Sequence, residues 1–220
     1  MKKLLVKITL VVISLVFFVA CEQPSIEKNG ISKHKGHEYV DLGLSVKWAT
    51  CNIGANSPEE YGDYFAWGEI NSKDIYSMDN YKYANMGNLT KYNHIDNKTT
   101  LDFDDDAARV NWGGKWRMPS VNECMELVKN CDIDIIEMNG VDCYKFTSKI
   151  EGYTDKNIFL PAGIIRSSAD AIPMYGVIFW TNEILGGFSY AGACCVVSTS
   201  PDILSEVERW FYLPIRPVCP

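Results

Sequence analysis

The chain has 220 residues, of which 47% are hydrophobic and 12% aromatic, and its formal net charge is -7. This apolar content is enough for one hydrophobic core and indicates a globular protein with a single main domain. The acidic balance disfavours nucleic acid as a partner.

The N-terminal segment predicts export. Lys2, Lys3 and Lys7 precede an uncharged, mostly apolar run, Ile8 to Ala20. This run is too short to span a bilayer as a helix. This pattern is typical of a signal peptide, so residues 1–20 are predicted to be removed from the mature protein.

The end of that leader resembles a bacterial lipobox, in which Cys21 follows Ala20 and becomes the lipidated first residue. More than one acyl chain, palmitate among them, would anchor the protein stably to a membrane without crossing it. The expected location is therefore the cell envelope, on the surface of the outer membrane. The alternative is an ordinary secretory signal in which Cys21 carries no lipid.

Residues 21–36 are predicted to be a flexible tether, because the segment is polar, contains Pro24, Gly30 and Gly36, and has no apolar period. The folded domain is then expected to cover residues 37–220.

The domain is predicted to open with two short strands, His37 to Leu42 and Val46 to Thr50. Tyr61 to Trp67 follows, and its density of aromatic residues is typical of a core. Asn71 to Thr100 shows no sustained period, so we predict a surface insertion with little regular structure.

The next segment is an acidic cluster with two readings. Its aspartates offer the oxygen ligands that calcium requires, although they lack the spacing of an EF-hand: Asp102, Asp104, Asp105 and Asp106. In the alternative, one aspartate caps a short helix, Ala107 to Asn111, and its neighbours favour the positive end of the helix dipole. Calcium is the one cofactor that the sequence suggests.

Gly113 to Met118 has the pattern of a turn that leads into a half-buried strand. Trp116 and Met118 are large and apolar, and they alternate with Lys115 and Arg117.

A helix is predicted to begin at Val121, because Ser120 and Glu123 match a capping box. The apolar residues of this helix recur at helical spacing: Val121, Cys124, Met125, Leu127 and Val128. We expect this face to pack against a sheet that carries Trp112 and Trp116.

The second half is predicted to be mostly β. Asn139 and Gly140 separate two apolar runs, Ile133 to Met138 and Val141 to Ser148, and this pair indicates a hairpin turn at positive φ. Further strands are expected at four places: Ile158 to Pro161, Val177 to Thr181, Ala191 to Thr199 and Trp210 to Arg216.

The segment DDAARVNWGGKWRMPSVNEC, residues 105–124, resembles the signature of bacterial surface lipoproteins with a Fibrobacter succinogenes major paralogous domain. Other parts of the chain follow the order of that family: His37 to Ala55, Pro58 to Glu69, Ile158 to Gly163 and Leu213 to Val218. The resemblance implies an α+β domain of C-type-lectin-like fold, with short twisted antiparallel sheets and one or two helices. It also implies a relation in outline to formylglycine-generating enzymes.

Few residues suggest catalysis. The histidines are His34, His37 and His94, and none stands beside a plausible nucleophile. Ser189 lies in GFSYA, which departs from a nucleophile elbow because Ala191 stands where the second glycine belongs. The absence of CxxC and HxxxH spacings argues against a zinc site, so we expect a non-catalytic protein.

The cysteines after Cys21 are odd in number, which leaves at least one thiol unpaired or paired between chains: Cys51, Cys124, Cys131, Cys143, Cys194, Cys195 and Cys219. On the apolar face of the predicted helix, Cys124 is expected to act as a small buried hydrophobe. Cys194 and Cys195 are neighbours in a predicted strand, where their side chains point to opposite faces.

The leading hypothesis is a lipid-anchored, non-catalytic binding module for an extracellular glycan or protein. In related C-type-lectin-like domains the loops between the last strands form the ligand surface, and on this chain they hold five candidate ligand-binding residues: Trp180, Asn182, Phe188, Trp210 and Tyr212. Such aromatic rings stack on sugar faces or anchor protein partners. Burial in the core is the alternative for Trp180 and Trp210.

The EPN or QPD motif of calcium-dependent sugar-binding lectins is absent, and Trp180-Thr181-Asn182 matches their WND motif only in part. Two other functions stay open. The odd cysteine count suggests a structural or assembly subunit of the cell envelope, and Cys194 with Cys195 suggests an enzyme of the formylglycine-generating type.

Overall fold

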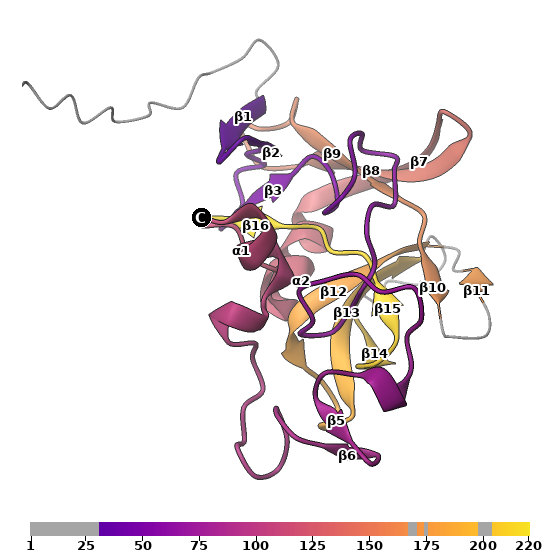
Figure 1. Cartoon of the computed structure of the whole chain (residues 1–220). Helices are drawn as coiled ribbons and strands as arrows, with labels where there is room; N and C mark the ends of the chain where they lie inside the picture. The colour runs from indigo at the N-terminus through magenta and orange to yellow at the C-terminus, as the bar shows by residue number, and fades with distance from the viewer. Residues whose placement is uncertain (1–30, 167–170, 174–175, 198–203) are drawn as a thin grey trace, which may run out of the picture.

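The computed structural model describes residues 31–166, 171–173, 176–197 and 204–220. The predicted leader, the lipidation residue Cys21 and the first part of the tether lie outside the described residues, as do residues 198–199 of one predicted strand. The described part contains five small antiparallel sheets and two α-helices, so the fold class is α+β (Figure 1).

The first sheet joins the beginning of the described chain to its end. It has the order β1-β2-β3-β16: Ile31–His34, His37–Val40, Lys47–Ala49 and Val218–Cys219. The two strands predicted at residues 37–50 are confirmed with shorter bounds. The tether prediction is wrong from Ile31 onward, because Lys35 and Gly36 adopt positive φ and turn β1 back onto β2.

The central sheet is buried on both faces. It consists of β12 (Gly176–Ile184), β13 (Tyr190–Val197) and β14 (Leu204–Glu208). Successive side chains point to opposite faces, so Trp180 packs into one core cluster and its neighbour Phe179 into another. This sheet therefore separates two hydrophobic cores.

Helix α2 (Val121–Asn130) covers the second of these faces. The capping box is confirmed, because the Ser120 hydroxyl accepts from the Glu123 amide at 3.2 Å and the Glu123 carboxylate accepts from the Ser120 amide at 2.8 Å. Cys124 is buried as predicted, but Met125 is 44% exposed and points away from the core.

The predicted partner of this helix is wrong. Trp112 is the last residue of α1 (Ala107–Trp112) and lies in no sheet, whereas α2 contacts β13, β12, β7 and β8. Trp116 and Met118 are buried as expected. The strand itself is reduced to a single bridge between Arg117 and Val218.

The Asn-Gly hairpin is confirmed. Strand β7 (Cys131–Met138) pairs with β8 (Val141–Ser148), and Asn139 and Gly140 have φ of 49° and 80°. Strand β9 (Asn157–Pro161) completes this sheet and forms one of its edges. In Figure 1 it lies beside the β1–β2 hairpin.

The remaining four-stranded sheet collects short strands from distant parts of the chain. Its order is β11-β10-β15-β4: Ala171–Pro173, Ile164–Arg166, Tyr212–Leu213 and Phe65–Ala66. The strand predicted at Trp210 to Arg216 is therefore only two residues long.

The segment Asn71 to Thr100 contributes to the core, contrary to the prediction of a surface insertion. It has little regular structure: the 3₁₀ helix η1 (Met78–Asn80) and the strands β5 (Ala84–Asn85) and β6 (Asn88–Leu89). Several of its tyrosines are nevertheless buried in the cluster that contains Trp67 and Trp180: Tyr76, Tyr81, Tyr83 and Tyr92. A second 3₁₀ helix, η2 (Phe103–Asp105), follows.

Candidate functional site

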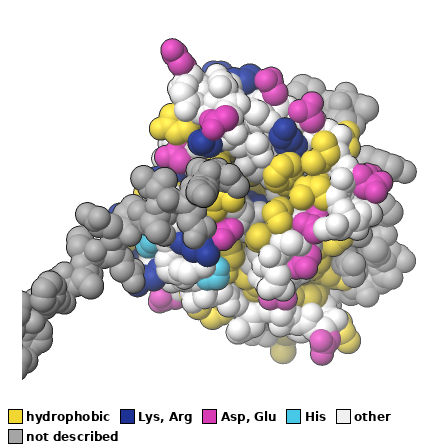
Figure 2. Space-filling view, turned by 90° about the horizontal axis from the view of Figure 1, so that it is seen from above, with side chains coloured by type: hydrophobic (Ala, Val, Ile, Leu, Met, Phe, Trp, Pro, Cys, Tyr) yellow, Lys and Arg dark blue, Asp and Glu magenta, His cyan; other side chains and the backbone are white. Residues whose placement is uncertain are grey.

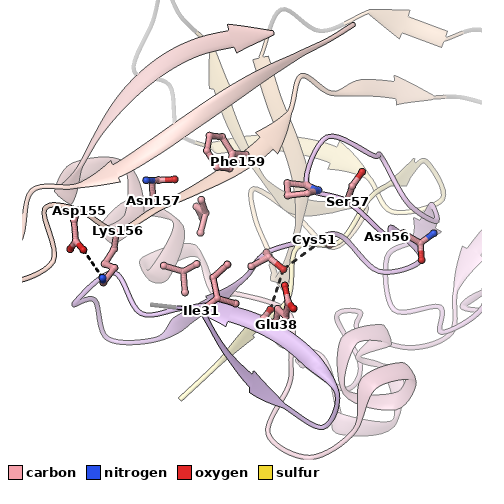
Figure 3. A pocket seen from close by; sticks show the side chains of 13 residues that line it. Ile31, Glu38, Cys51, Asn56, Ser57, Asp155, Lys156, Asn157 and Phe159 are labelled. Atoms are coloured by element: carbon pink, nitrogen blue, oxygen red, sulfur yellow. Dashed lines mark hydrogen bonds and ion pairs between the residues drawn. The ribbon is translucent and has the colours of Figure 1, made fainter. Parts of the chain in front are cut away.

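A pocket of about 580 Å³ lies between the β1–β2 hairpin and the edge strand β9 (Figure 3). This volume is in the range of small-molecule sites. Its lining comes from three distant parts of the chain: Ile31, Glu38, Val40, Thr50, Cys51, Asn56, Ser57, Pro58, Asp155, Lys156, Asn157, Ile158 and Phe159.

One side of the pocket is apolar. Ile31 lies opposite Val40 in the β1–β2 pairing, and Val40 and Ile158 belong to the core cluster beneath α2. Packing in the core therefore fixes the position of this apolar side of the pocket. The ring of Phe159, a residue of β9, is half-buried and lines the pocket.

The other side is polar, with amides, hydroxyls and charged groups. Each charged group has a partner: Asp155 lies 2.6 Å from Lys156, and Glu38 lies 3.2 Å from Lys33, which is outside the lining. Viewed from the top of Figure 1, the surface has a group of hydrophobic side chains with acidic and basic residues scattered around it (Figure 2). The site thus has no strong field of one sign.

A buried arginine holds the loop that brings Thr50 and Cys51 to the pocket. Arg216 donates from Nη1 to the carbonyls of Ala49 and Thr50, at 3.0 and 2.6 Å, and from Nε to Asn52 at 2.8 Å. Burial lowers the pKa of Arg216 to about 10, so the guanidinium is still charged at neutral pH.

The loop that carries Asn56, Ser57 and Pro58 is held by its own acidic residues. The Asn56 amide donates to Glu60 at 2.7 Å, and Glu59 accepts from Asn139 of the β7–β8 turn at 2.5 Å. The Asn-Gly turn therefore also supports the pocket, which the sequence pattern did not indicate.

The pocket lining contains a single candidate nucleophile of the cysteine type. Cys51 is the one thiol among the thirteen lining residues, and its sulfur contacts the Thr50 hydroxyl at 3.6 Å. None of these residues is a histidine that could act as its base.

Trp180 does not form a ligand surface, and this prediction is corrected. Its side chain is 0% exposed, and its indole nitrogen donates to the Phe65 carbonyl at 2.7 Å. The alternative stated for this residue, burial in the core, is what the structure has.

The other predicted ligand residues do not gather in the pocket. Asn182 lies within β12, and its backbone N–H donates to the Pro119 carbonyl, while the Phe188 carbonyl accepts from Arg209. Trp210 is half-buried beside Phe211, and Tyr212 stacks on Tyr76 with ring centroids 4.2 Å apart. All of them lie outside the lining of the pocket.

The alternative reading of the acidic cluster, a helix cap, is what the structure shows for Asp106, and lysines hold Asp102 and Asp105. Asp106 caps α1 and accepts from Arg109 and Met118, whereas Asp105 binds Lys82 and Lys91. Asp102 pairs with Lys98 at 2.7 Å and also with Lys91 at 2.6 Å, and Asp104 is exposed. Among the described residues no group of three or more acidic, cysteine or histidine side chains is placed to hold a metal ion.

Asp105 should make stability depend on pH. Burial alone would raise its pKa, but hydrogen bonds from Lys91, Tyr92 and Lys82 outweigh this and hold the pKa far below its usual value. A depressed folded-state pKa stabilises the protein above the unfolded pKa near 4, and this stability is lost as the pH falls toward the folded value. We expect Asp105→Asn to cost about 2 kcal/mol at pH 7 and less as the pH falls from 4 to 2.

Urea unfolding from pH 7 down to the lowest pH at which the protein stays folded measures this effect. Asp104→Asn, at an exposed neighbouring position, is the control and should leave the pH profile of the wild type unchanged. Equal pH profiles for Asp105→Asn and the wild type would contradict the prediction.

These features define an α+β domain with a ligand-sized pocket beside a sheet edge. No protein-family model, no curated protein and no solved structure matches the chain. Within the described residues, no helix has the length and apolar character needed to cross a membrane.

Proposed function

We propose that the protein is a lipid-anchored, non-catalytic binding module of the cell surface, with a C-type-lectin-like fold. In this proposal, the pocket beside β9 takes a sugar residue of an extracellular glycan. The observation that carries it is the pocket itself, about 580 Å³ in volume, with one apolar side and one hydrogen-bonding side. The leader and Cys21 support the anchor, and the short antiparallel sheets with two helices support the fold.

A sugar ring has an apolar C–H face and a rim of hydroxyl groups, and the pocket offers partners for both. The half-buried ring of Phe159 supplies a flat apolar surface. Asn56, Ser57 and Asn157 supply neutral donors and acceptors on the polar side. These neutral side chains suit a neutral sugar. When the ligand displaces water from the pocket, they need no oppositely charged partner.

The acidic residues of the pocket do not favour sugar hydrolysis. Glycosidases pair two carboxyl groups, and the general acid needs a raised pKa. The hydrogen bond from Lys156 instead lowers the pKa of Asp155, and Glu38 is paired with Lys33. This arrangement supports recognition without cleavage.

The test is binding of residues 22–220, without the leader and the lipidated Cys21, to a glycan array, with two variants that separate the candidate surfaces. Phe159→Ser removes the ring in the pocket, and Trp210→Ser removes a ring of the surface expected from the sequence. We expect Phe159→Ser to weaken glycan binding at least tenfold and Trp210→Ser to leave it within twofold. Loss of binding in Trp210→Ser alone would move the site to the loops between the last strands.

A protein partner is the second candidate. The four most exposed large apolar side chains of the described chain all lie between residues 75 and 103: Ile75, Met86, Ile95 and Phe103. Met86 and Ile95 are 95% and 78% exposed, which favours contact with another protein in a structural or assembly role. A folded sample that binds no glycan, and that self-associates unless Met86 and Ile95 are replaced by serine, would support this candidate.

A further inference from the structure

Two cysteines from distant parts of the chain meet between α2 and the central sheet. Cys194 lies in β13 on the face that α2 covers, and Cys124 lies on the face of α2 that packs against β13. The neighbouring residue Ala193 points to the opposite face, into the cluster that contains Trp180. Alternation along β13 thus directs the Cys194 side chain at the helix.

Both side chains are removed from solvent, with exposures of 0% for Cys124 and 1% for Cys194. They share a core cluster with Val177, Phe179 and Leu127, so their positions are fixed by packing. Burial raises the pKa of Cys124 well above its usual value, and the neighbouring thiol of Cys194 raises it further. Both thiols are free in the structure, and they lie in the same packed layer between α2 and β13.

We propose that Cys124 and Cys194 are joined by a disulfide that fixes α2 to the central sheet when the protein folds in an oxidising compartment. Each thiol loses its proton and the two sulfur atoms share a new bond. The two electrons pass to an oxidant of the disulfide class, which is reduced to two thiols.

Burial sets the order of events. Thiol–disulfide exchange requires an accessible thiolate, and neither sulfur is accessible once α2 has packed on β13. The bond therefore forms while the helix is still docking. A protein that has folded with both thiols reduced resists later oxidation at this position.

The same burial makes the bond persistent, because a reductant reaches it only when α2 detaches. The closed loop contains most of the second half of the domain, including the β7–β8 hairpin and β9. A cross-link over so long a loop removes much freedom from the unfolded chain. It therefore stabilises the helix that covers one of the two hydrophobic cores.

Counting free thiols in the denatured, unreduced protein tests the proposal. The full chain is exported to an oxidising compartment, purified, denatured and titrated with a thiol-specific dye. If the disulfide exists, Cys124→Ser releases the thiol of Cys194, and the count rises by one relative to the wild type. If both residues are free thiols, the same substitution lowers the count by one.

Two further variants make the sign of this change specific. Cys194→Ser should also raise the count by one, because it releases Cys124. Cys131→Ser is the matched control. Cys131 lies in the same core cluster, but the groups that act on its thiol are Lys149 and Asp132 and not Cys194. We expect it to leave the change caused by Cys124→Ser intact when the two are combined.

Peptide mapping and thermal unfolding complete the test. Mapping should recover the peptide that contains Cys124 linked to the peptide that contains Cys194, and Cys195→Ser should leave this link in place. Unfolding and refolding in reductant should lower the Tm of the wild type by about 10 °C and leave the Tm of the Cys124→Ser/Cys194→Ser variant unchanged. A lowered count in Cys124→Ser, or a link from Cys124 to another cysteine, would overturn the proposal.

Discussion

Replacing Arg209 with methionine is expected to destabilise the protein by about 4 kcal/mol. The guanidinium is fully buried and donates to the Tyr81 hydroxyl at 3.0 Å, and to the carbonyls of Tyr92 and Phe188, each at 2.9 Å. It also lies over the Trp67 ring, 4.9 Å from its centre. Methionine fills much of the space but leaves these buried acceptors without donors, and each unsatisfied group carries a desolvation cost.

Chemical denaturation measures the loss, and limited proteolysis locates it. Because Arg209 joins β14 to the segment Asn71 to Thr100, the variant should be cleaved first within that segment. Arg109→Met is the control, since Arg109 is half-exposed over the Phe103 ring and should cost less than 1 kcal/mol. A stability loss at Arg209 no larger than that of the control would contradict the prediction that its buried hydrogen bonds stabilise the fold.

Trp180→Ala is expected to cost about 3–5 kcal/mol, because it leaves a large cavity in the core beneath the central sheet. The indole also loses its hydrogen bond to Phe65, which holds β4 against β12. Trp180→Phe separates the two contributions: it keeps most of the apolar volume and should cost about 1–2 kcal/mol.

Urea unfolding of the three proteins measures these differences, and glycan binding by the folded fraction gives an independent readout. The structure places Trp180 in the core, so the folded fraction of Trp180→Phe should bind like the wild type. A variant with full stability and no binding would restore Trp180 to the ligand surface that the sequence suggested.

The elements that sequence reasoning predicted correctly depend on chemistry within a few residues. Ser120 and Glu123 satisfy each other's backbone donors, and Asn139 and Gly140 accept positive φ, whatever the rest of the chain does. Asp106 likewise caps α1 through an amide three residues away.

The errors concern burial, which distant segments decide. Gly176 to Thr181 is buried on both faces, so it shows no alternation that would separate a surface ring at Trp180 from a core ring. The segment Asn71 to Thr100 has no hydrophobic period, because only single tyrosines at irregular spacing are buried in the core. The hydroxyl of Tyr81 donates to Trp67, and that of Tyr83 to Gly68, which makes these buried positions compatible with irregular backbone.

The pocket has no local signal at all. Its lining joins β1 and β2 to the loop after β3 and to β9, and only the folded chain brings these parts together. Arg216, which holds one of its loops, reads in sequence as a charged residue near the end of the chain. Its burial depends on carbonyl groups more than a hundred residues away in the sequence.

The pairing of β16 with β3 has a consequence for the order in which the protein folds. Trp48 lies opposite Val218, and Val218 also bridges to Arg117, so the first sheet is complete only when the last described residues arrive. Such pairings between distant residues form slowly, because the entropy of closing the long loop is lost before the contact compensates for it. A chain that is still being synthesised therefore lacks the strand that closes its first sheet. The pocket beside that sheet takes its final shape only after the last strand has been synthesised and paired.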